Sequence, residues 1–277
     1  MRATIPQILE MARAGEKLPM LTAYDYPTAR LLDGAGIPLI LVGDSLGQVV
    51  LGYPSTLPVS MNEMITHASA VVRGTEQALV IGDMPFMSYQ TSEADGLRNA
   101  GRFLKEAGCQ AIKLEGGRQV APLVHQLVGY GIPVMGHIGL TPQSIHQLGG
   151  NRLQGRTAEQ ARELLADARA LEAAGAFSVV LELVPAQVSR LISEELEIPT
   201  IGIGAGPYCD GQVLVINDLL GMTPGFNPKF LKRYAELGEV IQGAVKSYAE
   251  EVRSGAFPDR EHSHWMSADE EALLLDS

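Results

Sequence analysis

Leu79-Val-Ile-Gly-Asp83 is a short apolar run that ends in a carboxylate, and seven other short apolar runs occur along the chain. None of them alternates strictly between apolar and polar residues, which is typical of strands buried on both faces of a parallel sheet. Helical patterns separate several of the runs. The eight predicted strands are Pro19–Tyr24, Leu39–Asp44, Leu79–Asp83, Ala111–Glu115, Pro133–His137, Ser178–Glu182, Thr200–Gly204 and Val213–Asn217.

Helix signals support this alternation. Ser92 with Asp95 resembles an N-capping arrangement, although the acid is Asp and not the usual Glu or Gln. Gly108 and Gly175 stand where C-terminal glycines belong. The helices predicted between strands are Ser60–Val72, Ser92–Ala107, Arg118–Gly129, Thr157–Ala174 and Ala186–Leu196.

The number and order of these elements favour an α/β fold of the (β/α)₈ type, the TIM barrel. An open, doubly wound sheet remains the alternative. An amphipathic stretch at Ile5–Ala14 is expected to cover one end of the barrel, and a long helix at Pro228–Ser254 to close its outside. The gap at Ala205–Gln212 is too short for a full helix, so that unit is abbreviated or the strand boundary is misplaced.

The domain organisation follows from the same pattern. Residues 1–255 are predicted to form a single barrel domain with an N-terminal capping helix, and residues 256–277 a surface arm. No internal repeat suggests another architecture.

Composition excludes several classes of protein. The net charge of −11, from 21 basic and 32 acidic residues, argues against a nucleic-acid partner. No apolar run approaches the length of a membrane span, and no signal peptide is evident. Cys109 and Cys209 cannot build a disulfide framework and fit no metal motif. We therefore expect reduced, inert thiols in a cytoplasmic protein with no membrane partner.

Polar residues collect at the ends of the predicted strands. A charge after an apolar run is costly unless it emerges into a solvated or metal-filled site. The carboxyl ends of barrel strands converge on one mouth, where the active site lies. The residues so placed are Asp44, Ser45, Asp83, Lys113, Glu115, His137 and Glu182.

Three of these residues indicate a metal site. Asp44, Asp83 and Glu115 supply only oxygen ligands, which favours Mg²⁺ or Mn²⁺ over Zn²⁺. Any one of these carboxylates is equally compatible with a salt bridge or a helix cap. Three at the ends of neighbouring strands favour a metal site.

The other polar residues each allow two interpretations. Lys113 projects to the same side as Glu115, so it can hold an anionic substrate or form a buried ion pair. Glu182, between two leucines, suits a general base with a raised pKa, or a structural carboxylate. His137 can donate to a substrate oxygen or satisfy a core hydrogen bond. The glycines of Gly202–Gly206 lack the dinucleotide-binding spacing, so a nicotinamide cofactor is not supported.

Five stretches of the sequence have a pattern more specific than their spacing: Leu41-Val-Gly-Asp-Ser-Leu-Gly47, Gly82-Asp-Met-Pro-Phe86, Ala111-Ile-Lys-Leu-Glu-Gly-Gly117, Gly136-His-Ile-Gly-Leu-Thr-Pro-Gln143 and Ile201-Gly-Ile-Gly-Ala-Gly206. They closely resemble motifs of the ketopantoate hydroxymethyltransferase family, and several are specific to that family. The resemblance runs from about Thr4 to Trp265, nearly the whole sequence.

The resemblance implies a barrel of the phosphoenolpyruvate/pyruvate-binding type that forms large homo-oligomers, typically decamers. It implies transfer of a one-carbon unit from 5,10-methylenetetrahydrofolate to 3-methyl-2-oxobutanoate, giving 2-dehydropantoate for pantothenate and coenzyme A biosynthesis. It also implies roles for matching residues: Mg²⁺ ligation by Asp44, Asp83 and Glu115, oxo-acid contacts from Asp44, Ser45, Asp83, Lys113 and His137, and proton acceptance by Glu182.

Two departures from the family pattern and two rival functions stay open. Asn151 stands where an aromatic residue is expected, and Asn217 where many relatives have His. One rival is another Mg²⁺-dependent 2-oxo-acid lyase of the same barrel type, although such lyases generally bring a reactive cysteine loop. The other is a non-catalytic barrel that binds a small acid, which would have no need of a base.

Overall fold

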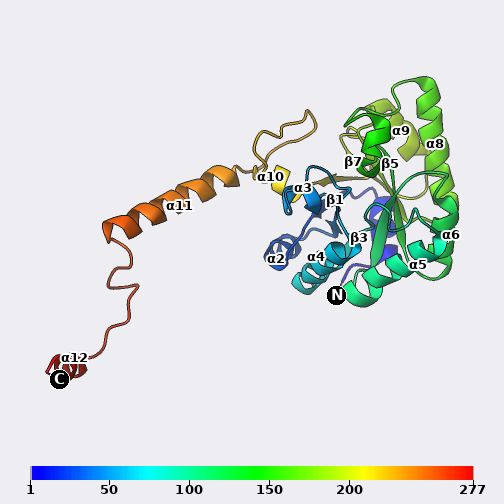
Figure 1. Ribbon diagram of the computed structural model, residues 1–277. Helices are drawn as coiled ribbons and strands as arrows, with labels where there is room; N and C mark the ends of the chain where they lie inside the picture. The colour runs from blue at the N-terminus through cyan, green and yellow to red at the C-terminus, as the bar shows by residue number, and fades with distance from the viewer. Residues whose placement is uncertain (1, 277) are drawn as a thin grey trace.

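The computed structural model describes residues 2–276, so Met1 and Ser277, the outer ends of the two predicted units, lie outside it. Within the described residues, eight parallel strands close into a barrel in which β8 pairs with β1 (Figure 1). The predicted (β/α)₈ barrel is confirmed and the open sheet is wrong. The strands are β1 (Leu18–Thr22), β2 (Leu39–Val42), β3 (Leu79–Asp83), β4 (Ala111–Glu115), β5 (Val134–Gly139), β6 (Ser178–Glu182), β7 (Thr200–Ile203) and β8 (Gly211–Leu214).

Helices follow most of the strands. The five predicted between strands are present, with small shifts at their ends, and a helix that was not predicted, α2, lies between β1 and β2. The helices are α1 (Ile5–Arg13), α2 (Tyr26–Gly34), α3 (Leu46–Val49), α4 (Met61–Gly74), α5 (Glu93–Arg102), the π-helical turn η1 (Phe103–Ala107), α6 (Ala121–Gly129), the 3₁₀ turn η2 (Pro142–Ser144), α7 (Ile145–Leu148), α8 (Ala158–Ala173), α9 (Ala186–Glu195), α10 (Ile216–Leu219), α11 (Leu237–Ser254) and α12 (Ala268–Leu275).

The inside of the barrel is packed with apolar side chains toward the amino ends of the strands. Leu79 and Ile81 of β3 belong to this inner cluster, together with Ala111 of β4 and Met135 of β5. Ile8 of α1 is fully buried in the same cluster, so the N-terminal helix closes this end as predicted. Because α1 closes the barrel at the amino ends of the strands, solvent reaches the interior from their carboxyl ends.

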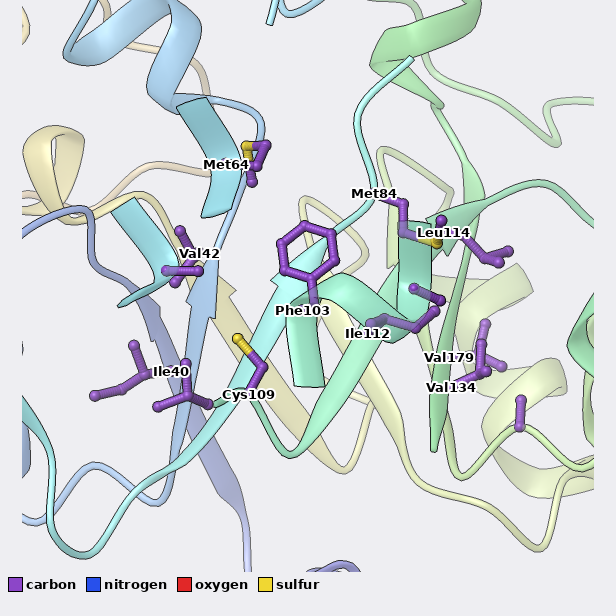
Figure 2. Close-up of a cluster of buried hydrophobic side chains, with 14 of the residues drawn as sticks. Ile40, Val42, Met64, Met84, Phe103, Cys109, Ile112, Leu114, Val134 and Val179 are labelled. Carbon is purple, nitrogen blue, oxygen red and sulfur yellow. The ribbon is translucent and has the colours of Figure 1, made fainter. Parts of the chain in front are cut away.

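A second cluster fills the space between the strands and the surrounding helices. Figure 2 shows Phe103 near the middle of it, with Ile40 and Val42 of β2 to one side and Ile112 and Leu114 of β4 to the other. Alternate residues of one strand thus enter different clusters, as the two-residue period of a strand requires. The barrel wall is therefore fixed from both faces, and the strand ends that carry the polar residues are held in place.

Gly82→Ala is expected to destabilise the protein by about 1–3 kcal/mol, because an added methyl group overpacks this wall. A Cβ atom added at position 82 would lie 2.2 Å from a ring carbon of Phe103. Gly101→Ala in α5 is the matched control: its Cβ meets nothing within 4 Å, and alanine stabilises a helix by roughly 0.5–1 kcal/mol relative to glycine. Urea unfolding of both variants measures the difference. Equal midpoints would show that Phe103 moves aside freely.

The last third of the chain departs from expectation. β8 begins at Gly211, two residues before the predicted start, and no helix lies in the described residues between β7 and β8. The final long helix, α11, begins at Leu237, nine residues after the predicted start at Pro228. It was expected to close the outside of the barrel, which is wrong: it buries no side chain and extends away from the barrel (Figure 1).

The exposed side of α11 is rich in apolar residues. Val240, Ile241, Val245 and Tyr248 are all largely accessible to solvent. The arm after it ends in α12, also without a buried residue. The domain boundary at residue 255 stays a prediction. Within residues 2–276, no helix is both long and apolar enough to cross a lipid bilayer.

Candidate active site

The polar residues predicted at the strand ends project into the barrel. Asp83 is two residues after Ile81, which lies in the inner cluster, so its side chain has the same inward direction. Lys113 and Glu115 stand in the same relation to Ala111 on β4. His137 follows Met135 on β5, and Glu182 follows Val180 on β6. Inward polar residues therefore replace inward apolar residues at the carboxyl end of each of these strands.

These side chains share one cavity of about 340 Å³ at the mouth of the barrel. That volume is within the range of small-molecule sites. Asp44 and Ser45 enter it from the turn after β2. The structure thus brings together every residue predicted for the site: Asp44, Ser45, Asp83, Lys113, Glu115, His137 and Glu182. Their chemical roles stay predictions.

A buried lysine is paired at the centre of the site. Lys113 Nζ lies 2.8 Å from Asp83 Oδ1, and both side chains are almost fully buried. Burial alone would lower the pKa of Lys113, but the carboxylates of Asp83, Glu115 and Asp44 hold that pKa above its usual value. The lysine is therefore charged and can face an anionic ligand.

The carboxylates are crowded. The backbone N–H of Asp44 donates to Asp83 Oδ2 at 3.1 Å. Burial and the nearby charge of Asp83 raise the pKa of Asp44, which Lys113 offsets only in part. Burial likewise raises the pKa of Glu115 well above its usual range, against the opposing charge of Lys113. Positive charge in the site is thus insufficient to hold all three acids ionised.

Two carboxylate oxygens also lack ordinary partners. Glu115 Oε1 and Asp83 Oδ1 are buried and accept no well-aligned hydrogen bond from residues 2–276, although Lys113 pairs with the second through charge. A buried oxygen of this kind is costly without a partner. Across the described residues, however, no three His, Cys, Asp or Glu side chains already have the spacing of a metal site. The donor set is hard and acidic, but it is not a closed cage of protein ligands.

His137 links the lysine to Glu182. Its Nδ1 lies 3.2 Å from Lys113 Nζ, and its Nε2 lies 3.2 Å from Glu182 Oε2 without hydrogen-bond alignment. Burial, and then the charge of Lys113, lower the pKa of His137 well below its usual value, so the ring is neutral. Because Lys113 can only donate, Nδ1 accepts and the proton is assigned to Nε2, facing Glu182.

Glu182 is the acid in the site suited to a base. Its side chain is 17% exposed toward the cavity, whereas that of Glu115 is 3% exposed. Burial raises the pKa of Glu182 to about 7, with only Lys113 opposing. A carboxylate with this pKa can accept a proton near neutral pH. Its environment agrees with the interpretation of a poised base more than with that of a structural carboxylate bonded to amides.

Sequence reasoning missed two residues of the site, Gln143 and Tyr89. Gln143 is buried, and its side-chain amide donates to Asp44 Oδ2 at 3.0 Å. Tyr89 Oη accepts from the backbone N–H of Glu115 at 3.1 Å. Tyr89 lies in a loop and Gln143 in the short turn η2, so strand periodicity gave no sign of them. Gln143 does end one of the motifs that carry the family resemblance, which was an unused signal.

The residues that depart from the family pattern have different positions. Asn151 lines the cavity, near its rim. Asn217 is not among the described residues that line it, and its Oδ1 is buried without a hydrogen-bond partner in the described chain. Both cysteines are buried free thiols outside the cavity lining, and burial raises the pKa of Cys109 to about 12. Neither is a reactive thiol of the kind that nucleophilic chemistry requires.

The fold and the acidic cavity at its mouth define a (β/α)₈-barrel enzyme. Comparison with known proteins gives the same architecture. Phosphoenolpyruvate phosphomutase from Streptomyces platensis subsp. rosaceus superimposes with a TM-score of 0.61 at 15% identity, covering 99% of this chain and 96% of that one. A 2,3-dimethylmalate lyase, a member of the PEP mutase/isocitrate lyase superfamily, gives a TM-score of 0.57 at 16% identity, covering 100% and 98%. At such identities the likeness shows the fold alone.

The sequence comparisons are more specific. The family model described as ketopantoate hydroxymethyltransferase matches residues 2–260. The 3-methyl-2-oxobutanoate hydroxymethyltransferase of Heliobacterium modesticaldum is 58% identical over 272 residues, which cover 98% of this chain and 99% of that protein. The chain belongs to the ketopantoate hydroxymethyltransferase family. The family resemblance of its motifs is confirmed.

Proposed function

We propose that the chain transfers a hydroxymethyl group from 5,10-methylenetetrahydrofolate to 3-methyl-2-oxobutanoate and so forms 2-dehydropantoate. The observation that carries this proposal is the shared cavity, in which three carboxylates and Lys113 lie beside a glutamate whose pKa is near neutrality. Family membership supplies the two substrates. In the overall reaction water provides the hydroxyl oxygen, C3 of the oxo acid gains a carbon–carbon bond, and tetrahydrofolate leaves.

A divalent cation fits the acidic side of the cavity. Asp44, Asp83 and Glu115 would hold Mg²⁺, since their oxygens are hard ligands and Glu115 Oε1 accepts no hydrogen bond from the described residues. A closed cage of protein ligands is not required, because Mg²⁺ commonly keeps few protein ligands and fills the rest with water or substrate oxygens. Bound Mg²⁺ would supply a Lewis acid that stabilises negative charge on the keto oxygen.

Lys113 and Ser45 bind the oxo acid in this proposal. Lys113 presents a charged, almost fully buried ammonium group to the cavity, where attraction to an anion is strong because water is largely excluded. Ser45 Oγ lies 2.8 Å from Tyr24 Oη, which fixes its position beside Asp44. Together these groups orient the oxo acid so that its C3–H bond faces Glu182.

Glu182 removes the proton from C3. The carboxylate accepts that proton, and the electron pair left behind is delocalised onto the keto oxygen as an enolate. His137, neutral and with its Nε2 proton facing the cavity near Glu182, can donate that proton in a hydrogen bond to a substrate oxygen. C3 then attacks the folate-derived methylene carbon and forms the new carbon–carbon bond. The two bonds from this carbon to folate nitrogens break, the nitrogens take up protons, and water supplies the hydroxyl group, so that tetrahydrofolate leaves.

The reaction is tested by incubating the protein with Mg²⁺, methylenetetrahydrofolate and 3-methyl-2-oxobutanoate and measuring 2-dehydropantoate by mass spectrometry. We expect product that depends on all three additions. A lyase would instead cleave a carbon–carbon bond of an acidic substrate, and a non-catalytic barrel would bind the oxo acid and give no product. Burial of the Cys109 thiol, which raises its pKa, disfavours the lyase.

A decameric assembly and a cytoplasmic location are further expectations. Light scattering would test the first, and cell fractionation the second.

The rate should depend on pH through Glu182. Burial raises its pKa, so its basic form is lost as the pH falls through about 7. We expect kcat at saturating Mg²⁺ to fall roughly tenfold per pH unit below that midpoint. Steady-state kinetics over roughly two pH units on either side of that midpoint measure the profile. An acid limb at 4.5, the usual pKa of a glutamate, would contradict a base in a desolvated site.

A further inference from the structure

The buried side chain of Gln143 makes more contacts with the acids of the cavity than a packing role requires. It comes from η2, just after β5, and is 5% exposed. Its amide nitrogen donates to Asp44 Oδ2 at 3.0 Å and to the backbone carbonyl of Met84 at 2.9 Å. Met84 directly follows Asp83. One side chain therefore ties the turn after β2 to the end of β3.

The backbone of the same residue reaches the third acid. The N–H of Gln143 donates to Glu115 Oε2 at 3.0 Å. Since Glu115 Oε1 accepts no hydrogen bond from the described chain, this contact fixes the carboxylate with its other oxygen free. Gln143 thus contacts Asp44 and Glu115 directly, and Asp83 through the neighbouring carbonyl.

Tyr89 fixes the orientation of the amide. Its hydroxyl lies 2.8 Å from Gln143 Oε1 and accepts from the N–H of Glu115 at 3.1 Å. Gln90 Nε2 donates to the same Oε1 at 3.0 Å. Both amide protons and both acceptor positions of Gln143 are then used. The carboxylate of Asp44 and the carbonyl of Met84 only accept, so the amide cannot be flipped without losing both bonds.

We propose that Gln143, held by Tyr89, is a positioning residue that orients the carboxylates of Asp44 and Glu115 for a divalent cation; this inference rests on the proposed Mg²⁺ site. The physical reason is that carboxylates which must be ionised to bind a cation repel one another in a desolvated cavity. Hydrogen bonds from a neutral donor fix two of them at a shared opening and leave one oxygen of Glu115 available. Fully satisfied polar networks of this kind rigidify a site.

The test is binding of Mg²⁺ alone, measured by titration calorimetry on the full-length protein. Gln143→Met preserves side-chain length and the backbone donor but removes both amide contacts, and we expect roughly 10- to 100-fold weaker binding. Tyr89→Phe, a smaller change for the fold, should weaken binding in the same direction. Gln147→Met is the matched control, because Gln147 lies on the adjacent helix α7 with its side chain exposed, and that side chain makes no hydrogen bond to Gln143 or to the carboxylates; its affinity should be unchanged.

Three results separate this inference from its alternatives. If the wild-type chain does not bind Mg²⁺, the proposed metal site fails and this inference with it. If the wild type binds but Gln143→Met and Tyr89→Phe bind equally well, Gln143 has no positioning role and the metal site stands. If Gln147→Met loses as much affinity as Gln143→Met, general loosening of this segment explains the effect and the inference is overturned.

A kinetic split distinguishes positioning from stability. In Gln143→Met we expect the Mg²⁺ concentration for half-maximal rate to rise roughly 10- to 100-fold, while kcat at saturating Mg²⁺ stays within about threefold of the wild type. A purely structural residue would lower the urea midpoint and leave the metal dependence of the folded fraction unchanged. That second pattern would remove Gln143 from the site.

Discussion

Glu182→Gln should abolish exchange of the C3 proton of 3-methyl-2-oxobutanoate with solvent. The loss expected is about 10²–10⁴-fold, the usual contribution of a general base. The substitution keeps the size of the side chain and an oxygen that His137 Nε2, 3.2 Å away in the wild type, can still approach. Binding of the oxo acid should therefore change little. In our mechanism, exchange is lost because the substitution removes the carboxylate that accepts the C3 proton.

Deuterium incorporation at C3 in D₂O, followed by NMR with Mg²⁺ but without folate, measures this step apart from carbon transfer. Oxo-acid affinity is measured separately by calorimetry. Glu195→Gln is the control. Glu195, at the end of α9, pairs with Arg169 of α8 on the protein surface, outside the cavity. Its exchange rate should equal that of the wild type. Unimpaired exchange in Glu182→Gln would assign the base to another group.

Asp83→Ala should weaken binding of both Mg²⁺ and the oxo acid. Asp83 is at once a proposed ligand, the ion-pair partner of Lys113 at 2.8 Å, and the acceptor for the Asp44 N–H at 3.1 Å. Removing one partner of a buried pair costs about 3–5 kcal/mol, because the other charge is left unpaired. We expect Mg²⁺ affinity to fall roughly 100-fold or more, which corresponds to about 3 kcal/mol.

Asp83→Asn separates charge from shape in this position. The amide keeps the volume and an oxygen for the Asp44 N–H, but it has no charge for Lys113 or the cation. Calorimetry of Mg²⁺ binding and urea unfolding should therefore show a smaller stability loss than in Asp83→Ala, with metal binding still impaired. Full activity of Asp83→Ala without added metal would contradict the site.

The barrel and most of its site could be predicted because the relevant signals are local. A strand places alternate residues on one face, so an acid two positions after an inward apolar residue, as in Ile81 and Asp83, must also point inward. The cap of α5 was similarly local: Ser92 Oγ accepts from the N–H of Asp95, as expected. The left-handed Gly108 ends η1, again where a C-terminal glycine was expected.

The features that were missed depend on contacts distant in sequence. Gln143 lies 99 positions from Asp44 in the sequence. No periodicity connects a residue in one turn to a carboxylate in the turn after a different strand. The prediction that α11 packs against the outside of the barrel was wrong for a related reason. The sequence indicated a long helix, but no local pattern says which surface such a helix meets. Residues 220–236, between α10 and α11, form no helix, and α11 extends away from the barrel.

A crystal structure of the chain with Mg²⁺ and 3-methyl-2-oxobutanoate, determined without folate, would examine the chemistry most directly. We predict one ion inside the cavity, bound by Asp44, Asp83 and Glu115, with the oxo acid beside Lys113 and its C3 turned toward Glu182. An ion bound elsewhere, or an oxo acid whose C3 faces away from Glu182, would contradict the proposed reaction.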